Sequence, residues 1–272
     1  MTTTGPREAV PLTRRSALVL TAASVAGLLM FIWPLLITPG AEQSRVDQPF
    51  LFMALMPVVV LVVVAELSEG GLDSKALAML GVLSAINAAV LPLGAGVAGV
   101  ELVFFLLILG GRVFGAGFGF VLGCTSLFAS ALLTSGVGPW LPFQMLCAAW
   151  VGMGAGLLPR RPTGRAEIAM LAVYGIAAAY AFGLLMNLSS WPFTLGIAVP
   201  GATDSLAMVP GDPIWENLQR FGIFTLLTSF WGWDTGRAIT NALLIVTLGP
   251  AVLATLRRAA RRARYLPKES SR

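Results

Sequence analysis

The chain between Phe104 and Gln144 reads FFLLILGGRVFGAGFGFVLGCTSLFASALLTSGVGPWLPFQ and contains the features that decide the fold. Two apolar runs meet at a glycine-rich segment that carries one arginine, Arg112. The second run ends in the elbow GVGPWLPFQ, Gly136–Gln144, which is rigid, aromatic and carries an amide. Because hydrophobicity alone does not require such an elbow, we look for function here first.

Four glycines recur at four-residue spacing: Gly111, Gly115, Gly119 and Gly123. On one continuous helix they would form a smooth stripe against which a neighbouring backbone packs closely. A continuous helix over Glu101–Thr134 would be about 50 Å long, however, and a hydrocarbon core is ~30 Å thick. We therefore favour a turn at Gly110, Gly111 and Gly115. Arg112 then lies at the water boundary, and only Gly119 and Gly123 serve packing.

Composition places the chain in the membrane. Hydrophobic residues make up 57% of its 272 residues, charged residues only 11%, and the mean hydropathy is +0.83. These values lie outside those of soluble globular proteins. The first 15 residues lack a signal-peptide pattern, so we expect the first span to be retained. The sequence predicts an all-α integral membrane protein, a polytopic helix bundle.

The apolar segments predict about eight transmembrane helices, so both termini share one side of the membrane. The predicted spans are Ser16–Ile37, Phe50–Ala65, Ala76–Leu93, a short Gly99–Gly111, Val113–Thr134, Leu141–Leu158, Ala166–Leu188 and Gly236–Leu256. With the termini inside, 15 of the 18 Lys and Arg residues are cytoplasmic, and only Arg45, Arg220 and Arg237 are not. Cytoplasmic loops carry the basic excess, so we predict cytoplasmic termini and a multi-pass plasma-membrane protein.

The spans divide the chain into four parts. Residues 1–15 form a cytoplasmic tail, residues 16–66 a two-helix extension, residues 76–256 a six-helix core, and residues 257–272 a basic cytoplasmic tail. An acidic loop with Gly70-Gly71 separates the extension from the core. The basic run RRAARRAR at 257–264 is expected to contact anionic lipid headgroups. Because the positive-inside rule explains the basic residues, no nucleic-acid partner is expected.

Several classes of chemistry are disfavoured. The chain has no histidine, which removes the commonest general base and the commonest metal ligand. Its two cysteines, Cys124 and Cys147, fall within apolar spans and are expected to be buried free thiols. No paired-carboxylate site is visible. We predict neither an enzyme, nor a metal site, nor a bound cofactor.

Polar and aromatic residues gather at one side of the predicted bundle. The stretch Ser189–Thr235 is predicted to be a long external loop with four of the seven tryptophans, although such rings also form interfacial belts. Phe221–Phe230 within it is too short to cross and is expected to be amphipathic or re-entrant. Intramembrane polar groups are costly and mark function. The predicted solute-binding residues are Glu101, Trp140, Gln144, Asn187, Trp191, Trp231, Trp233 and Asn241.

Two predicted features have alternative explanations. Glu101 begins a helix, where the macrodipole favours an acid without any binding role. Gly81, Ala85 and Ala89 form a small-residue face on the third span. That face either packs on a sister helix or docks on a second protein, and both alternatives stay open.

The segments Leu109–Gly123 and Gly138–Met145 resemble S components of energy-coupling factor (ECF) transporters. The likeness covers about Ala76–Leu256 and is closest to the cobalamin and corrinoid branch, with its Gly-Arg-x-x-Gly turn and Gly-Pro-Trp-x-Pro-x-Gln-Met elbow. It implies a six-helix subunit that captures a vitamin-like solute from outside. It also implies a transmembrane coupling subunit, docked at Gly81, Ala85 and Ala89, and cytoplasmic ATPases, since this chain has no Walker motif.

The chain departs from that family in its two extra N-terminal spans and in the long Ser189–Thr235 stretch. Two other functions therefore stay open. One is a membrane scaffold or assembly protein without a solute. The other is a stand-alone secondary transporter, although such proteins usually show internal repeats and ionisable residues at the membrane midplane.

Overall fold

The structure is a computed structural model that describes residues 13–36, 74–94, 99–193, 205–209 and 211–264. These residues form helices and contain no strand. The α-helices are α1 (Arg14–Leu36), α3 (Ser74–Val90), α4 (Val103–Phe114), α5 (Ala116–Leu133), α6 (Leu141–Leu157), α7 (Arg165–Ser190), α8 (Ile214–Thr225), α9 (Thr235–Thr247) and α10 (Gly249–Arg264). Short 3₁₀ segments η1 (Leu91–Gly94) and η2 (Trp191–Phe193) follow α3 and α7, and a π-helix, η3 (Leu226–Asp234), joins α8 to α9.

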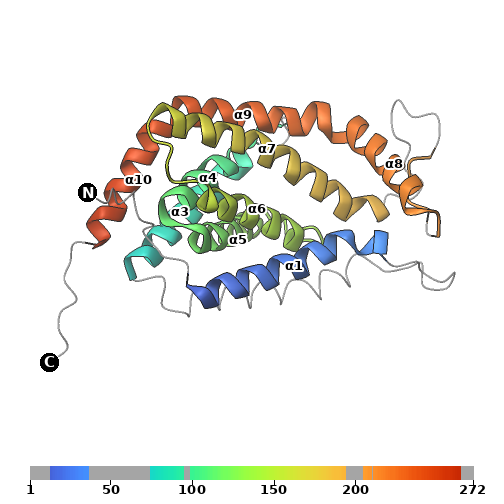
Figure 1. The fold of residues 1–272 in the computed structure, drawn as a ribbon, viewed down its shortest axis with the longest axis horizontal. Coiled ribbons are helices and arrows are strands. Elements are labelled where there is room, and N and C mark those ends of the chain that lie inside the picture. Colours follow the sequence, from blue (N-terminus) through green and yellow to red (C-terminus); the bar gives the residue numbers. More distant parts are fainter. Residues whose placement is uncertain (1–12, 37–73, 95–98, 194–204, 210, 265–272) are drawn as a thin grey trace.

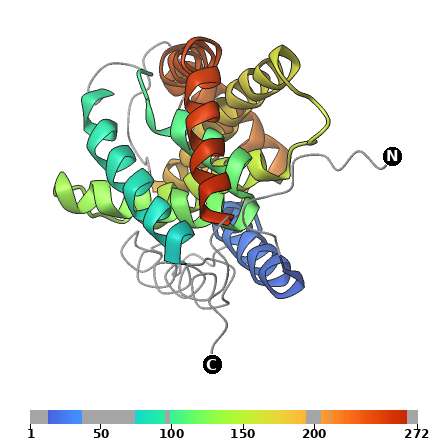
Figure 2. The ribbon, with the colours of Figure 1, turned by 90° about the vertical axis from the view of Figure 1, so that its left-hand side faces the viewer.

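Most helices run along the long axis of the molecule (Figure 1). The pair α5 and α6 makes the most extensive contact, α4 packs on both, α3 packs on α5, and α7 pairs with α9. Seen from one end, α1 and α3 flank this centre on two sides, with α7 and α9 above it (Figure 2). Among the described residues, four helices are long and apolar enough to cross a membrane, or five if the bent α8–α10 segment counts as one. The chain is a helical membrane protein.

Five of the predicted spans match helices of the structure closely, and a sixth lies outside the described residues. The predicted spans at Ser16–Ile37 and Ala76–Leu93 correspond to α1 and to α3 with η1. Those at Leu141–Leu158 and Ala166–Leu188 correspond to α6 and α7, and Val113–Thr134 corresponds to α5. Phe50–Ala65 lies outside the described residues. The eight spans and the side of the termini stay predictions.

The predicted turn near Arg112 is confirmed, but it is formed by one glycine. Gly115 ends α4 and precedes α5 with φ 112°, a conformation that residues with a Cβ rarely adopt. Gly110 and Gly111, predicted as turn residues, are instead helical. Arg112 does not face water, because its side chain is only 3% exposed and is bonded inside the protein, and its depth in the membrane stays a prediction.

Three glycines hold α4, α5 and α6 at backbone contact. A Cβ placed on Gly152 of α6 would lie 2.8 Å from the carbonyl carbon of Gly119 on α5. A Cβ on Gly111 of α4 would lie 2.9 Å from the carbonyl carbon of Gly152. Gly123 faces the Ala148–Ala149 backbone in the same way. The glycine stripe thus packs as a continuous stripe would, although Gly115 breaks the helix within it.

The predicted external loop Ser189–Thr235 is wrong for most of its described length. Ser189 and Ser190 end α7, and α8, η3 and α9 form one helix from Ile214 to Thr247, drawn along the upper edge of Figure 1. Phe221–Phe230 belongs to this helix and is not a separate re-entrant segment. At 1.5 Å per residue the helix is about 51 Å long.

The predicted last span, Gly236–Leu256, is not one continuous helix, because the helix breaks within it. The axis bends by 65° between the helix that ends at Thr247 and the helix that begins at Gly249. Pro250 explains the break, since proline lacks an N–H and suits the first turn of a new helix.

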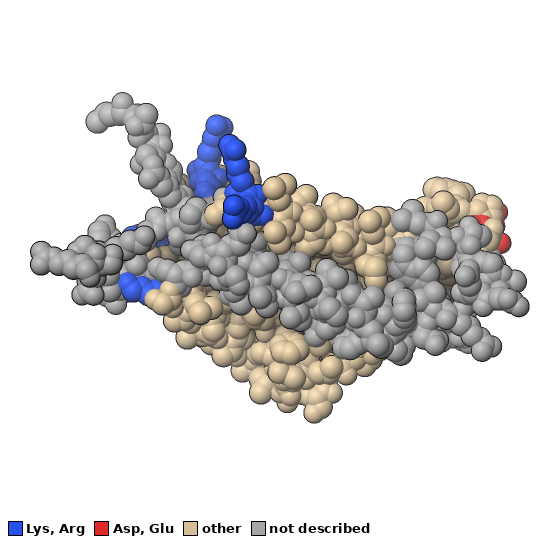
Figure 3. All heavy atoms as spheres, turned by 90° about the horizontal axis from the view of Figure 1, so that it is seen from below, with Lys and Arg blue, Asp and Glu red and all other residues tan. Residues whose placement is uncertain are grey.

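Charge divides the bundle into two ends. Lys and Arg gather at the left end in Figure 3, and Asp and Glu show at the right end. The basic end contains Arg14 and Lys75 at the starts of α1 and α3, and Arg258 and Arg261 on α10, which also lies there in Figure 1. The acidic end contains Asp212 and the start of α8. We name these the basic end and the acidic end.

The glycine contact predicts that Gly152→Ala destabilises the protein. The added methyl would overlap a backbone and not a flexible side chain, so the helices must separate, at about 1–3 kcal/mol or more. Thermal unfolding of the purified protein in detergent measures the loss. Gly222→Ala on α8 is the matched control, because an added Cβ there meets nothing within 4 Å and alanine favours a helix. A melting temperature of Gly152→Ala at or above that of Gly222→Ala would contradict the packing.

Candidate functional site

Arg237 is the centre of a buried ionic network near the start of α9. Its Nε donates to Glu101, which lies just before α4, and its Nη1 donates to Asp234 Oδ1 at 2.9 Å. The guanidinium carbon also lies 4.8 Å from the centroid of Phe182 and 5.7 Å from that of Phe104. Two carboxylates and two ring faces thus neutralise and enclose one cation.

The network continues from Asp234 to α7. The Ser229 hydroxyl donates to Asp234 Oδ2 at 2.8 Å, and Asn187 Nδ2 donates to the Ser229 hydroxyl at 2.7 Å. Asp234 is only 2% exposed and lies against Gly183, where any Cβ would overlap its carboxylate. Asp234 can therefore be buried against α7 only because Gly183 has no side chain. We call Glu101, Arg237, Asp234, Ser229 and Asn187 the Arg237 network.

The Arg237 network lies within the bundle, away from the basic end. Arg237 is ten residues from Thr247, where α9 ends at the basic end, which corresponds to about 15 Å along the helix. From the same end, the 12 residues of α4 cover only about 18 Å of a ~30 Å core. Glu101 and Arg237 thus meet about 15–18 Å from the basic end, measured along these two helices. Ionisable residues buried among apolar helices are rare and mark function by default.

Three of the predicted binding residues come together here. Glu101 and Asn187 belong to the Arg237 network, and Asn241 Nδ2 donates to the Arg237 carbonyl at 2.9 Å. Asn241 is fully buried beside Gly175 of α7, and its Oδ1 has no partner among the described residues. Each of these side chains has a partner within the protein, so the network joins α4, α7 and α9.

The other predicted residues form no hydrogen bond or ion pair with the network among the described contacts. Trp191 is fully buried, its ring lies 5.3 Å from that of Phe221 at an interplanar angle of 53°, and its Nε1–H donates to the Leu206 carbonyl at 2.8 Å. Trp231 and Trp233 are exposed on η3, and Trp140 is half exposed at the start of α6. Gln144 is partly buried in the first turn of α6. The aromatic rings therefore do not form one wall with the buried amides.

The small residues predicted for docking lie on the outside. Gly81, Ala85 and Ala89 are exposed on α3, and nothing lies within 4 Å of a Cβ placed on Gly81. The opposite face of α3, with Leu83 and Ala88, packs into the bundle. No described helix therefore covers this face.

A second ionic cluster lies at the basic end, and its central acid was missed by sequence reasoning. Glu167 Oε1 accepts from Arg112 Nε at 2.7 Å and from Arg257 Nη2 at 2.6 Å. Arg112 Nη1 also donates to the carbonyls of Leu158 and Pro159 at 3.1 and 3.0 Å. In the sequence, Glu167 looks like an ordinary acid in the first turn of a helix. The Arg237 network did leave a signal in the sequence, because Asp234 and Arg237 are opposite charges three residues apart and such residues meet on one face of a helix.

Comparisons with protein-family models, with curated protein sequences and with solved structures each return no match. The functional argument therefore starts from the residues described above.

The Arg237 network predicts that Arg237→Gln is strongly destabilising. Removing the cation leaves Glu101 and Asp234 as uncompensated charges in a largely buried site, at about 3–5 kcal/mol. Arg220→Gln is the matched control at the acidic end, where Arg220 forms partly exposed pairs with Asp212 and Glu216 worth at most about 1 kcal/mol. Melting of both variants in detergent gives the comparison. An Arg237→Gln protein that melts like the wild type would show that the network does not hold the helices together.

Proposed function

We propose that this protein is the substrate-binding S component of an ECF importer. In this function it captures a vitamin-like solute of the cobalamin or corrinoid type at its outer face. A transmembrane coupling subunit and cytoplasmic ATPases supply the energy. The proposed orientation has eight spans in the plasma membrane, both termini in the cytoplasm and the acidic end outside.

The observation that carries the proposal is the exposed face of Gly81, Ala85 and Ala89. Small residues allow the backbones of two membrane helices to approach closely. A small-residue face that meets only lipid gains nothing from this property. Within the described residues no helix packs on this face, and the sister-helix alternative then falls to the predicted span Phe50–Ala65, which lies outside them. A coupling subunit that packs on α3 would use it.

The second support is the resemblance of the turn and the elbow. Gly115 forms the turn, and the Gly136–Gln144 elbow leads into α6 with Trp140 half exposed at its start. In the proposed site, Trp140, Trp231 and Trp233 provide apolar contact, Gln144 provides a hydrogen bond, and the Arg237 network below closes the site toward the cytoplasm. Apolar walls with few placed polar groups are usual in ligand sites.

A second candidate function is stand-alone secondary transport. The observation that favours it is the cluster of ionisable residues Glu101, Asp234 and Arg237 inside the helical bundle, whose formal charges sum to −1. Reconstituted protein that accumulates solute under an ion gradient, without any ATPase, would establish this function and exclude the importer subunit.

The docking face predicts that Ala85→Leu weakens assembly. A bulky side chain would hold the coupling helix away, and a loss of about 1.4 kcal/mol lowers the association constant about tenfold. Co-purification with a co-expressed ECF coupling subunit and its ATPases measures assembly. Ala177→Leu, at an exposed alanine of α7, is the matched control and should assemble normally. Unchanged co-purification with Ala85→Leu would leave the face without a docking role.

The solute site predicts that Gln144→Leu weakens binding while leaving the fold intact. Loss of one polar partner should raise Kd about 5- to 150-fold, which corresponds to about 1–3 kcal/mol. The solute is first found from the thermal stabilisation of purified protein by a vitamin panel that includes corrinoids. Gln219→Leu makes the same substitution at an exposed position of α8 and should not change Kd. Equal Kd values for both variants would move the site away from the elbow.

A further inference from the structure

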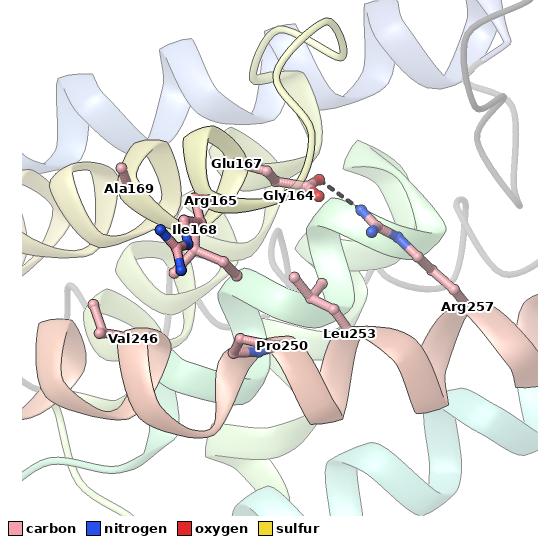
Figure 4. A pocket seen from close by; sticks show the side chains of 9 residues that line it. All are labelled: Gly164, Arg165, Glu167, Ile168, Ala169, Val246, Pro250, Leu253 and Arg257. Atoms are coloured by element: carbon pink, nitrogen blue, oxygen red, sulfur yellow. Dashed lines mark hydrogen bonds and ion pairs between the residues drawn. The ribbon is translucent and has the colours of Figure 1, made fainter.

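A cavity at the basic end combines cations with an apolar wall. It has a volume of about 690 Å³ and lies between the start of α7 and the bend from α9 to α10 (Figure 4). Arg165 and Arg257 provide cations at its lining, and Ile168, Val246 and Leu253 provide apolar surface. This volume falls within the range of small-molecule sites.

The charge of the cavity is positive. Glu167 also lines it, but this one acid already accepts hydrogen bonds from Arg112 and Arg257. The two arginines and one glutamate of the lining sum to a formal charge of +1. Arg257 Nη2 donates to Glu167 Oε1, as the dashed line in Figure 4 shows. The other N–H groups of this guanidinium have no hydrogen-bond partner among the described residues and can donate to a bound anion.

Helix α10, which forms part of the cavity wall, has the pattern of a helix at a membrane surface. Leu253, Leu256 and Ala260 are buried, whereas Arg258 and Arg261 are exposed. The helix leaves the axis of α9 at 65°. Such a helix, with its apolar face inward, its basic residues outward and a tilted axis, is typical of headgroup depth.

We propose that this cavity binds the phosphate headgroup of an anionic membrane lipid. Arg165 and Arg257 contact the phosphate, and an acyl chain follows Ile168, Val246 and Leu253. A soluble phosphate ester has the same headgroup chemistry, but it would leave the apolar wall uncovered. Basic pockets between membrane helices bind anionic headgroups by this combination of contacts. The site is separate from the solute site and does not depend on the proposed transport function.

The test measures phosphatidylglycerol binding to the full-length protein in neutral detergent by native mass spectrometry. Arg165→Gln removes an exposed arginine of the cavity and should lower affinity about tenfold or more, because a charged hydrogen bond is lost. Arg258→Gln is the matched control on α10 outside the lining, and should lower affinity at most about fivefold through the surface charge alone. Equal losses in the two variants would overturn the proposal.

A second variant tests the cavity without changing charge. Ala169→Trp fills the lining at an exposed position of α7, so the melting temperature in zwitterionic detergent should be retained while phosphatidylglycerol binding is lost. Binding that survives Ala169→Trp would overturn the cavity as the site. Stabilisation by glycerol phosphate equal to that by phosphatidylglycerol would overturn the lipid assignment in favour of a soluble phosphate.

Discussion

The close approach of α4, α5 and α6 at Gly111, Gly119 and Gly152 is the constraint on which the rest of the structure depends. The three backbones meet with no side chain between them. In lipid, where apolar side chains gain little by leaving the solvent, such contact supplies dispersion and weak Cα–H hydrogen bonds. It also fixes the angle at Gly115, because the two glycines on either side of this turn must reach the same glycine of α6.

The two ionic networks hold the two ends of α4. Glu101 precedes the helix and pairs with Arg237 of α9, while Arg112 in its last turn pairs with Glu167 of α7. With only 12 residues, α4 is too short to cross and gains its position from protein contacts rather than from the bilayer. A buried ion pair adds little net stability, but the protein loses much stability when one partner of the pair is removed. The two networks therefore favour the one arrangement of these helices in which every charge is paired.

The parts of the fold that depend on local composition were predictable from the sequence. Apolar length located α1, α3, α5, α6 and α7 within a few residues, and the length limit of a span located the turn at Gly115. The helix over 214–247 was missed because Gly222, Gly232 and its tryptophans resemble an interfacial loop when read locally. The buried positions of Arg112 and Asp234 depend on Glu167 and on the space above Gly183, which no local pattern reveals.

The length of the α8–α9 helix also limits what the bilayer can explain at the acidic end. Trp231 lies 16 residues from Thr247, about 24 Å along the helix, which is within the ~30 Å length of one hydrocarbon core measured from Thr247. Trp215 lies another 16 residues away, about 48 Å from Thr247, and its side chain is 75% exposed. A single interfacial belt could therefore include Trp231 and Trp233 or Trp215, but not all three, because Trp231 and Trp215 are about 24 Å apart along the helix. The exposed indole in the first turn of α8 thus needs an explanation other than the belt that would hold Trp231 and Trp233.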